Sequence, residues 1–188
     1  MSHLTGKRVA ILASNGFEES ELLEPMRALR EHGAHVDVVS PETGSIQGLR
    51  HFEKGQTVPV DRDVAGAEAA DYDALVSPRG LFNPDALRHD DDAIRFTRSF
   101  FDAGKPVGAI CHGPWVLVDA GVVESRELTS VPNIHRDLEN AGARWVDREV
   151  VVDQGLVTSR TPKDLPAFCA KLVEEIAEGR HAGQAASA

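Results

Sequence analysis

Short apolar runs alternate with longer amphipathic stretches along most of this sequence. Some of these runs have the length of a buried strand, namely "RVAILAS" (8–14), "HVDVVS" (35–40), "YDALVS" (72–77) and "PVGAI" (106–110). Strands that alternate with helices form right-handed crossover units and a mostly parallel sheet, which helices cover on both faces. The sequence therefore predicts an α/β fold with three layers.

The first amphipathic stretch, residues 17–34, predicts a helix because Leu22, Met26 and Leu29 recur at helical spacing. Pro25 lies inside this pattern and favours a kink or an early restart of the helix. The other expected elements are helices over 91–103, 111–121, 133–142 and 162–179, a strand over 127–131, a hairpin over 148–160, and turns with short edge or hairpin strands over 41–70.

The length of 188 residues favours one domain with a sizeable core. We expect residues 1–179 to form that domain and residues 180–188 to be a disordered tail, because "RHAGQAASA" offers nothing that would order it. No apolar stretch approaches the roughly 20 residues that span a bilayer, and the start lacks the apolar segment of a signal peptide. These features favour a cytoplasmic protein without a membrane partner.

The formal net charge is −10, from 30 acidic and 20 basic residues. Such a negative field repels phosphate backbones, so nucleic acid is not an expected partner. The sequence holds no glycine-rich phosphate-binding pattern, and we expect neither a nucleotide cofactor nor a metal. Its two cysteines, Cys111 and Cys169, are too few for a disulfide framework, and Cys169 is interpreted as a core residue of the last helix.

Three turns follow strands that run in the same direction. They come after Ser14, after Ser77 and after Ile110. Ligands of parallel sheets bind outside the carboxyl ends of the strands, so we expect the contents of these turns to converge.

The third of these turns contains the run "GAICHGPW", in which Cys111 passes from the strand to the next helix. A lone cysteine is usually an inert core residue. Amides at the start of a helix, however, stabilise a thiolate and lower the pKa of a thiol, and a sharp strand-to-helix turn lifts a side chain clear of the sheet. Gly108 and Gly113 leave room for a close backbone. From the residues alone, a core filler and a reactive thiol both stay open.

The segments "AICHGPW", "GFEESEL" and "TSRTPKDLPAF" together resemble the PfpI-type intracellular peptidases. These belong to the superfamily of the Parkinson-disease protein deglycase, which is similar to the class I glutamine amidotransferases. The resemblance covers residues 7–179. It implies a flavodoxin-like sandwich, a nucleophilic cysteine at the elbow, and a homo-oligomer of at least two copies. Members of the family act as peptidases, as glyoxalases or deglycases on reactive carbonyls, or as stress chaperones.

The resemblance places Glu18 at the position of the carboxyl that touches the cysteine sulfur. Two anions in contact do not both ionise, so the expected state is a protonated Glu18 that donates to a Cys111 thiolate. The neighbouring Glu19 is easily assigned this role by mistake, but Glu18 stands at the motif position. Without the family, Glu18 is equally well an acid that stabilises the first helical turn.

His112 directly follows the cysteine. Consecutive helical residues point about 100° apart, so helical geometry keeps its ring away from the neighbouring sulfur. The family pattern nevertheless gives His112 a catalytic role, with an acid of an adjoining subunit orienting the ring. The matching acid here is Asp85, whose alternative role is that of a helix-start acid after Pro84.

The turn "VSPRGLFNP" departs from the family, whose members carry a Gly-Gly pair that supplies an oxyanion hole. This chain has Arg79 and Gly80 there. Arg79 either narrows the pocket or adds a guanidinium that lowers the pKa of Cys111. Gly80 and Gly113 complete the expected pocket and oxyanion site.

The function that follows is a cysteine-dependent hydrolase of stress defence that needs no cofactor. Its expected substrate is a small carbonyl compound, a glycated protein or a peptide. The alternative is a redox sensor or chaperone in which Cys111 oxidises reversibly to a sulfenic acid.

Overall fold

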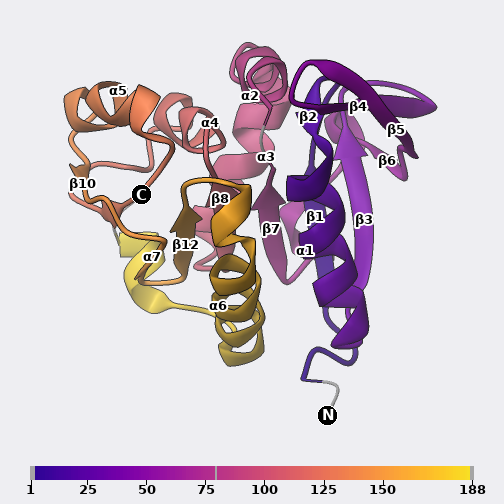
Figure 1. Ribbon diagram of the computed structural model, residues 1–188. Coiled ribbons are helices and arrows are strands. Elements are labelled where there is room, and N and C mark those ends of the chain that lie inside the picture. The colour runs from indigo at the N-terminus through magenta and orange to yellow at the C-terminus, as the bar shows by residue number, and fades with distance from the viewer. Residues whose placement is uncertain (1–2, 79, 187–188) are drawn as a thin grey trace.

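The structure is a computed structural model that describes residues 3–78 and 80–186. Its centre is a seven-stranded sheet in the order β11-β12-β8-β7-β1-β3-β6 (Figure 1). The strands of this sheet are β1 (Arg8–Leu12), β3 (His35–Ser40), β6 (Arg62–Asp63), β7 (Ala74–Ser77), β8 (Val107–Ile110), β11 (Val150–Asp153) and β12 (Leu156–Ser159). Every neighbouring pair is parallel except the hairpin β11–β12. The predicted α/β class and mostly parallel sheet are confirmed.

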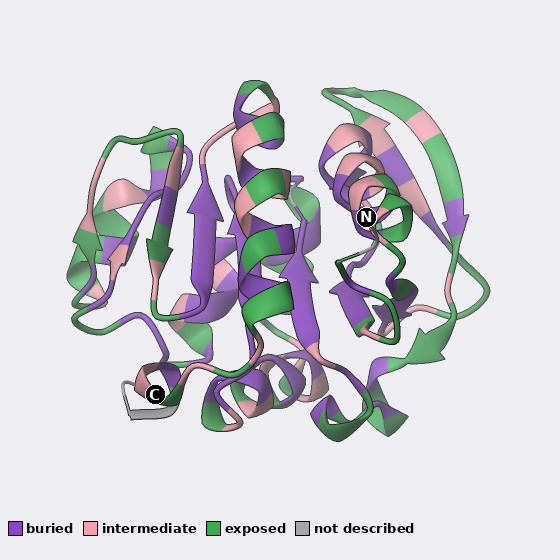
Figure 2. Cartoon of the chain, turned by 90° about the horizontal axis from the view of Figure 1, so that it is seen from below, coloured by how far each residue is buried: buried purple, intermediate pink, exposed green. Residues whose placement is uncertain are grey.

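Helices cover both faces of this sheet. Helices α1 (Glu19–Glu31) and α6 (Leu165–Glu178) contact each other on one face, and α3 (Asp91–Asp102) packs with α4 (Pro114–Asp119) and α7 (Ala182–Ala186) on the other. The remaining α-helices among the described residues are α2 (Phe82–Leu87) and α5 (His135–Asn140). Figure 2 shows the buried strands between helices whose outward residues are exposed. The layers are therefore those that the alternating sequence pattern predicts.

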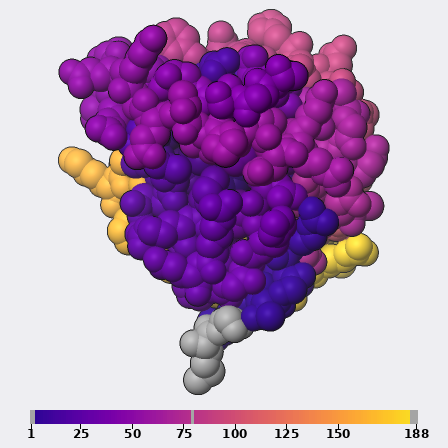
Figure 3. All heavy atoms as spheres, turned by 90° about the vertical axis from the view of Figure 1, so that its right-hand side faces the viewer, coloured from indigo at the N-terminus to yellow at the C-terminus, as the bar shows by residue number. Residues whose placement is uncertain are grey.

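A second, three-stranded sheet lies beside the first. It has the order β2-β4-β5 and consists of β2 (Phe17–Glu18), β4 (Ser45–Arg50) and β5 (Glu53–Pro59). Strands β4 and β5 form an antiparallel hairpin, as the sequence predicts for part of residues 41–70. Residues of the N-terminal third, this hairpin among them, cover most of the face in Figure 3.

Several boundaries differ from the sequence prediction. Helix α1 continues from Glu19 to Glu31 with Pro25 inside it, rather than restarting there. The helix expected at 111–121 begins only at Pro114, because residues 111–113 form a turn. The strand expected at 127–131 is reduced to β9 (Glu127–Leu128), which pairs with β10 (Arg144–Trp145) outside the main sheet.

Residues 180–186 differ from the disordered tail expected over 180–188, of which residues 187 and 188 lie outside the described part of the chain. The segment turns into α7, and the side chain of Gln184 is fully buried. The amide nitrogen of His181 donates to the carbonyl of Gly104, and Arg126 Nη2 donates to the carbonyl of Gln184 at 2.8 Å. These partners are distant in sequence, so composition alone did not reveal them. No helix among the described residues has both the length and the apolarity that crossing a membrane requires.

Candidate active site

Cys111 occupies a strained elbow directly after β8. Its φ angle is +58°, a left-handed conformation that costs a non-glycine residue about 1–2 kcal/mol. Its amide donates to the carbonyl of Ser159 at 2.9 Å, and its carbonyl accepts from Val131 N at 3.1 Å. The surrounding chain thus holds the strained residue in place, which is typical of functional turns.

Glycine is required just beyond the elbow. A Cβ on Gly113 would lie 2.8 Å from the carbonyl oxygen of Ser77 and 2.9 Å from that of Ile110. No side chain fits there. Gly113 therefore lets the chain turn tightly against the end of β7, in agreement with the close backbone approach expected at this glycine.

The turn after β7 presses on the turn after β1. Gly80 has a φ of +137°, and a Cβ on it would collide with the carbonyl oxygen of Gly16. The preceding Arg79 lies outside the described residues, so its expected effect on the pocket and on the cysteine stays a prediction.

Asn83 joins the same two turns. Its side chain is fully buried, its Nδ2 donates to the carbonyl of Pro78 at 2.9 Å, and its Oδ1 accepts from Ser14 N at 2.6 Å. Sequence reasoning missed this residue because "FNP" reads as an ordinary turn. Helix α2, in which Asn83 lies, begins before Pro84, whereas the sequence suggested a helix start only after Pro84, as the alternative role of Asp85.

The three turns converge, as predicted, around an open cavity of about 340 Å³. The residues that line it come from these turns, from the tip of the β4–β5 hairpin and from the segment before α5: Gly16, Glu18, Leu49, His51, Phe52, Gly80, Leu81, Phe82, His112 and Asn133. The cavity therefore brings together Glu18, Gly80 and His112, three of the residues singled out from the sequence.

Cys111 lies behind this wall, and its side chain is fully buried. Its sulfur is 3.7 Å from Nδ1 of His112, whose ring packs edge-on against Trp115. The expectation that His112 points away from the sulfur is wrong, because residues 111–113 are a turn rather than the first residues of a helix. The sulfur is fully buried, whereas the alternative function, a redox sensor, requires a thiol that an oxidant can reach.

Glu18 and Glu19 have separate tasks. Glu18 lines the cavity, and its Oε2 accepts a hydrogen bond from the backbone amide of His51 at 3.1 Å. Glu19 instead binds the hairpin, accepting from Gln56 N at 2.5 Å and from Arg50 Nε at 3.0 Å. The amide of Gln56, followed by Arg50, lowers the pKa of Glu19. Glu19 is thus an anchor of the hairpin.

Glu21 is a third carboxyl near the start of α1, and it is not among the site residues expected from the sequence. It lies on α1 one turn after Glu18, and its side chain has no exposed surface. Its sequence signal is a charged residue four positions before Pro25, on the side of the helix that faces the core. A fully buried acid near a candidate site is itself a candidate for proton chemistry.

Asp85 does not join this cluster within one chain. It is exposed on α2 and is not among the described residues that line the cavity. Its predicted pairing with a histidine of an adjoining subunit stays a prediction, since the structure holds one copy.

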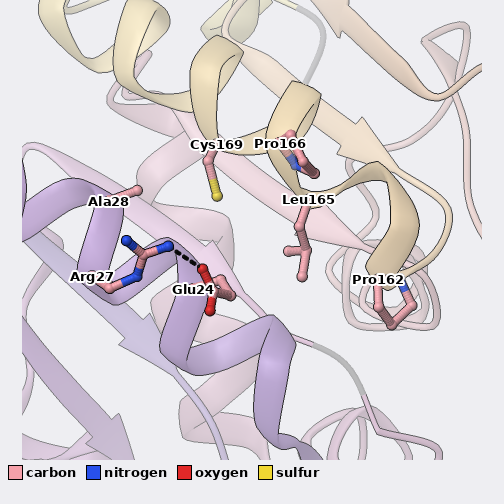
Figure 4. Close-up of a pocket in the computed structure, with 7 residues that line it drawn as sticks. All are labelled: Glu24, Arg27, Ala28, Pro162, Leu165, Pro166 and Cys169. Atoms are coloured by element: carbon pink, nitrogen blue, oxygen red, sulfur yellow. Dashed lines mark hydrogen bonds and ion pairs between the residues drawn. The ribbon is translucent and has the colours of Figure 1, made fainter.

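The second thiol, Cys169, has a different environment. It lies in a groove between α1 and α6, near the ion pair of Glu24 and Arg27 (Figure 4). It is only partly buried, yet desolvation, assisted by the charge of Glu24, raises its pKa to about 11. Cys169 is therefore a poor nucleophile at neutral pH.

One group of potential metal ligands lies at the opposite end of the sheet. Ligand atoms of Glu175, Glu178 and His181 lie within 4.8 Å of one another. Nε2 of His181 is 3.2 Å from Glu175 Oε2, so these two side chains already contact each other directly. The amide of His181 is hydrogen-bonded to Gly104, which lies before the start of β8. Cys111 lies directly after the end of β8. This group is therefore separate from the candidate active site.

Comparison with known proteins identifies the family. Residues 7–175 match the model of the DJ-1/PfpI family. General stress protein 18 of Bacillus subtilis is 44% identical over 165 residues, which cover 87% of this chain and 94% of the relative. Protein/nucleic acid deglycase 2 of Escherichia coli is 44% identical over 165 residues, with 86% and 93% covered.

The fold agrees with solved structures of this family. The crystal structure of Drosophila melanogaster DJ-1beta matches with a TM-score of 0.83 and 28% identity, covering 96% of this chain and 94% of that one. The flavodoxin-like fold expected from the resemblance is confirmed. The chain belongs to the DJ-1/PfpI family.

Proposed function

We propose that this protein is a cysteine-dependent enzyme that acts on reactive carbonyl compounds or their adducts on proteins. The observation that carries the proposal is the elbow: Cys111 has a φ of +58° directly behind a cavity lined by Glu18, Gly80 and His112. Relatives named as a deglycase and as a general stress protein support the same function.

In the proposed first step, the sulfur of Cys111 adds to the carbonyl carbon, and the carbonyl π electrons move to the oxygen. The amides of Gly80 and His112 hold that oxygen as its charge develops. Well-aimed donors of this kind contribute about 2.7–4 kcal/mol each to catalysis. Because the sulfur is buried, a small movement of the residues above it must accompany substrate entry.

Glu18 is the proposed proton carrier. Its Oε2 already accepts from His51 N, so Oε1 is the oxygen that holds the proton and shares it with the sulfur. His112, within 3.7 Å of that sulfur, is the second acid–base group. Asp85 of a second copy would orient its ring, which makes the working enzyme at least a dimer.

A 2-oxoaldehyde illustrates the proposed atom balance. After addition of the sulfur, the hydrogen on the attacked carbon leaves as a proton, and a proton returns to the neighbouring carbonyl carbon. The product is a 2-hydroxy thioester. Water then displaces the sulfur and releases a 2-hydroxy acid, so the net reaction consumes one water and needs no external oxidant or reductant. With an amide, the sulfur would displace an amine before water releases the acid.

The test is turnover of methylglyoxal, of a glycated protein and of a peptide by the wild type, Cys111→Ser and Cys169→Ser. We expect multiple turnovers of a carbonyl substrate that disappear in Cys111→Ser and persist in the matched control Cys169→Ser. A redox sensor would instead be supported if no substrate is turned over and if the protein protects a client protein to an extent that changes after peroxide treatment.

A second comparison assigns the proton carrier. Glu18→Gln and Glu21→Gln each remove one buried carboxyl while retaining its shape. If Glu18 carries the proton, Glu18→Gln lowers kcat by about 100-fold or more. A larger loss in Glu21→Gln, in a protein that remains folded by circular dichroism, would transfer this role to Glu21.

A further inference from the structure

Large apolar side chains at the surface gather at the mouth of the candidate active site. Among the described residues, the large hydrophobic side chains that are exposed are Phe52 (97%), Phe82 (61%), Leu81 (52%) and Val152 (39%). The first three line the active-site cavity, whereas Val152 lies on the edge strand β11. Exposed apolar residues that cluster in this way mark binding sites more often than scattered ones do.

The position of Phe82 is fixed by the neighbouring turn. A Cβ on Gly16 would lie 2.7 Å from the Cβ of Phe82, so this side chain rests directly on the Gly16 backbone. Gly16 has a φ of +80°, which further favours glycine there. Asn83, next in the chain, is locked between two turns. Phe82 is thus presented from a rigid base.

Phe52 approaches from the other side. It lies at the tip of the β4–β5 hairpin, directly after His51, whose φ is +58° and whose amide is bonded to Glu18. The hydrogen bond ties the tip of the hairpin to the proposed proton carrier. Because Phe52 and Glu18 line the same cavity, one ligand can contact both residues.

The rest of the cavity wall is polar. Glu18, His51, His112 and Asn133 line it together with the apolar residues. Such a cavity suits a ligand with a polar, reactive end and an apolar substituent. A volume of about 340 Å³ also exceeds what a three-carbon dicarbonyl fills.

We propose that Phe52, Leu81 and Phe82 form an apolar wall that binds an aromatic or branched aliphatic substituent next to the reacting carbonyl. The site then selects carbonyl substrates with such a substituent over methylglyoxal. This inference rests on the proposed function, because it assigns the reacting carbonyl to Cys111. It makes the three side chains determinants of specificity.

Binding without reaction tests the wall independently of turnover. Phenylacetamide and acetamide are unreactive amides that differ by the phenyl group, and their affinities for Cys111→Ser protein are measured by NMR titration. We expect phenylacetamide to bind more tightly than acetamide, and Phe52→Ala or Phe82→Ala, each combined with Cys111→Ser, to weaken its binding by roughly ten-fold. Val152→Ala in the same background is the control and should leave binding unchanged.

Turnover gives the second readout. The ratio of kcat/KM for phenylglyoxal to that for methylglyoxal should exceed one in the wild type and in Val152→Ala. It should fall by roughly ten-fold in Phe52→Ala and Phe82→Ala. If no carbonyl is turned over but phenylacetamide still binds through the two phenylalanines, the proposed function fails while the apolar wall stands.

Three results would overturn the inference. The first is equal affinity of phenylacetamide and acetamide for the Cys111→Ser protein, and the second is equal phenylacetamide affinity in all variants. The third is a fall in the sedimentation coefficient of Phe52→Ala or Phe82→Ala without any phenyl-dependent binding, which would show that the wall is an interface between copies of this chain.

Discussion

Oε2 of Glu18 accepts a hydrogen bond from the backbone amide of His51 at 3.1 Å. This bond joins β2 to the tip of the β4–β5 hairpin, 33 residues further along the chain. The proposed proton carrier therefore also positions one side of the cavity.

Substitution of Glu18 separates these two roles. Glu18→Gln retains an acceptor for His51 N, whereas Glu18→Ala removes it at a cost of about 0.5–1.5 kcal/mol. We expect hydrogen exchange of the hairpin tip to be faster in Glu18→Ala and nearly unchanged in Glu18→Gln. Equal exchange in the wild type and both variants would mean that the bond does not hold the tip.

Asn83→Ala should lower the free energy of unfolding by about 2–4 kcal/mol, because it leaves the amide of Ser14 and the carbonyl of Pro78 buried without their partner. Urea denaturation measures this loss. Asn140→Ala, at an exposed position at the end of α5, is the matched control and should change stability by less than about 0.5 kcal/mol. Similar stability of the two variants would contradict the bridging role of Asn83.

Gly80→Ala should prevent the close contact between the turns after β7 and β1, because the added Cβ collides with the carbonyl oxygen of Gly16. We expect a markedly lower melting temperature or no soluble protein. The control is Gly66→Ala, since a Cβ on Gly66 meets nothing within 4 Å. Equal melting temperatures for both variants would show that the Gly80 turn is not packed as described.

The anchor of the hairpin should weaken in acid. The pKa of Glu19 is lowered in the folded protein, so its contribution is complete above the pKa of the unfolded chain and is lost as the pH falls through the lower, folded value. The difference in unfolding free energy between the wild type and Glu19→Gln should therefore be largest near neutral pH and shrink towards pH 3. A difference that stays constant over this range would exclude the ionised anchor.

Removal of residues 180–188 should destabilise the protein. It takes away Gln184, whose carbonyl accepts from the buried guanidinium of Arg126, and each buried group left without a partner costs about 1–3 kcal/mol. A chain that ends at residue 186 is the control in denaturant titrations. If residues 1–179 alone are as stable as the control, the C-terminal contacts contribute nothing to folding.

The alternation of apolar and amphipathic segments was enough to predict the order of the main-sheet strands, the long helices between them and the three converging turns. It did not reveal the hydrogen bonds that connect these turns, because Asn83 and His51 bind partners that are distant in sequence. The pairing of His112 with the cysteine sulfur was missed for a local reason. A left-handed residue at Cys111 interrupts the expected helix and brings the ring close, and no sequence pattern indicated that conformation.

The reactivities of the two cysteines give the most direct test of the central claim. Exposure alone favours Cys169, which is only partly buried, over the fully buried Cys111. If Cys111 is the activated thiol, iodoacetamide at pH 7 labels it in the folded protein well before Cys169, whose pKa is about 11. Peptide mapping that finds Cys169 labelled first, or Cys111 unlabelled until the protein unfolds, would contradict the proposed chemistry.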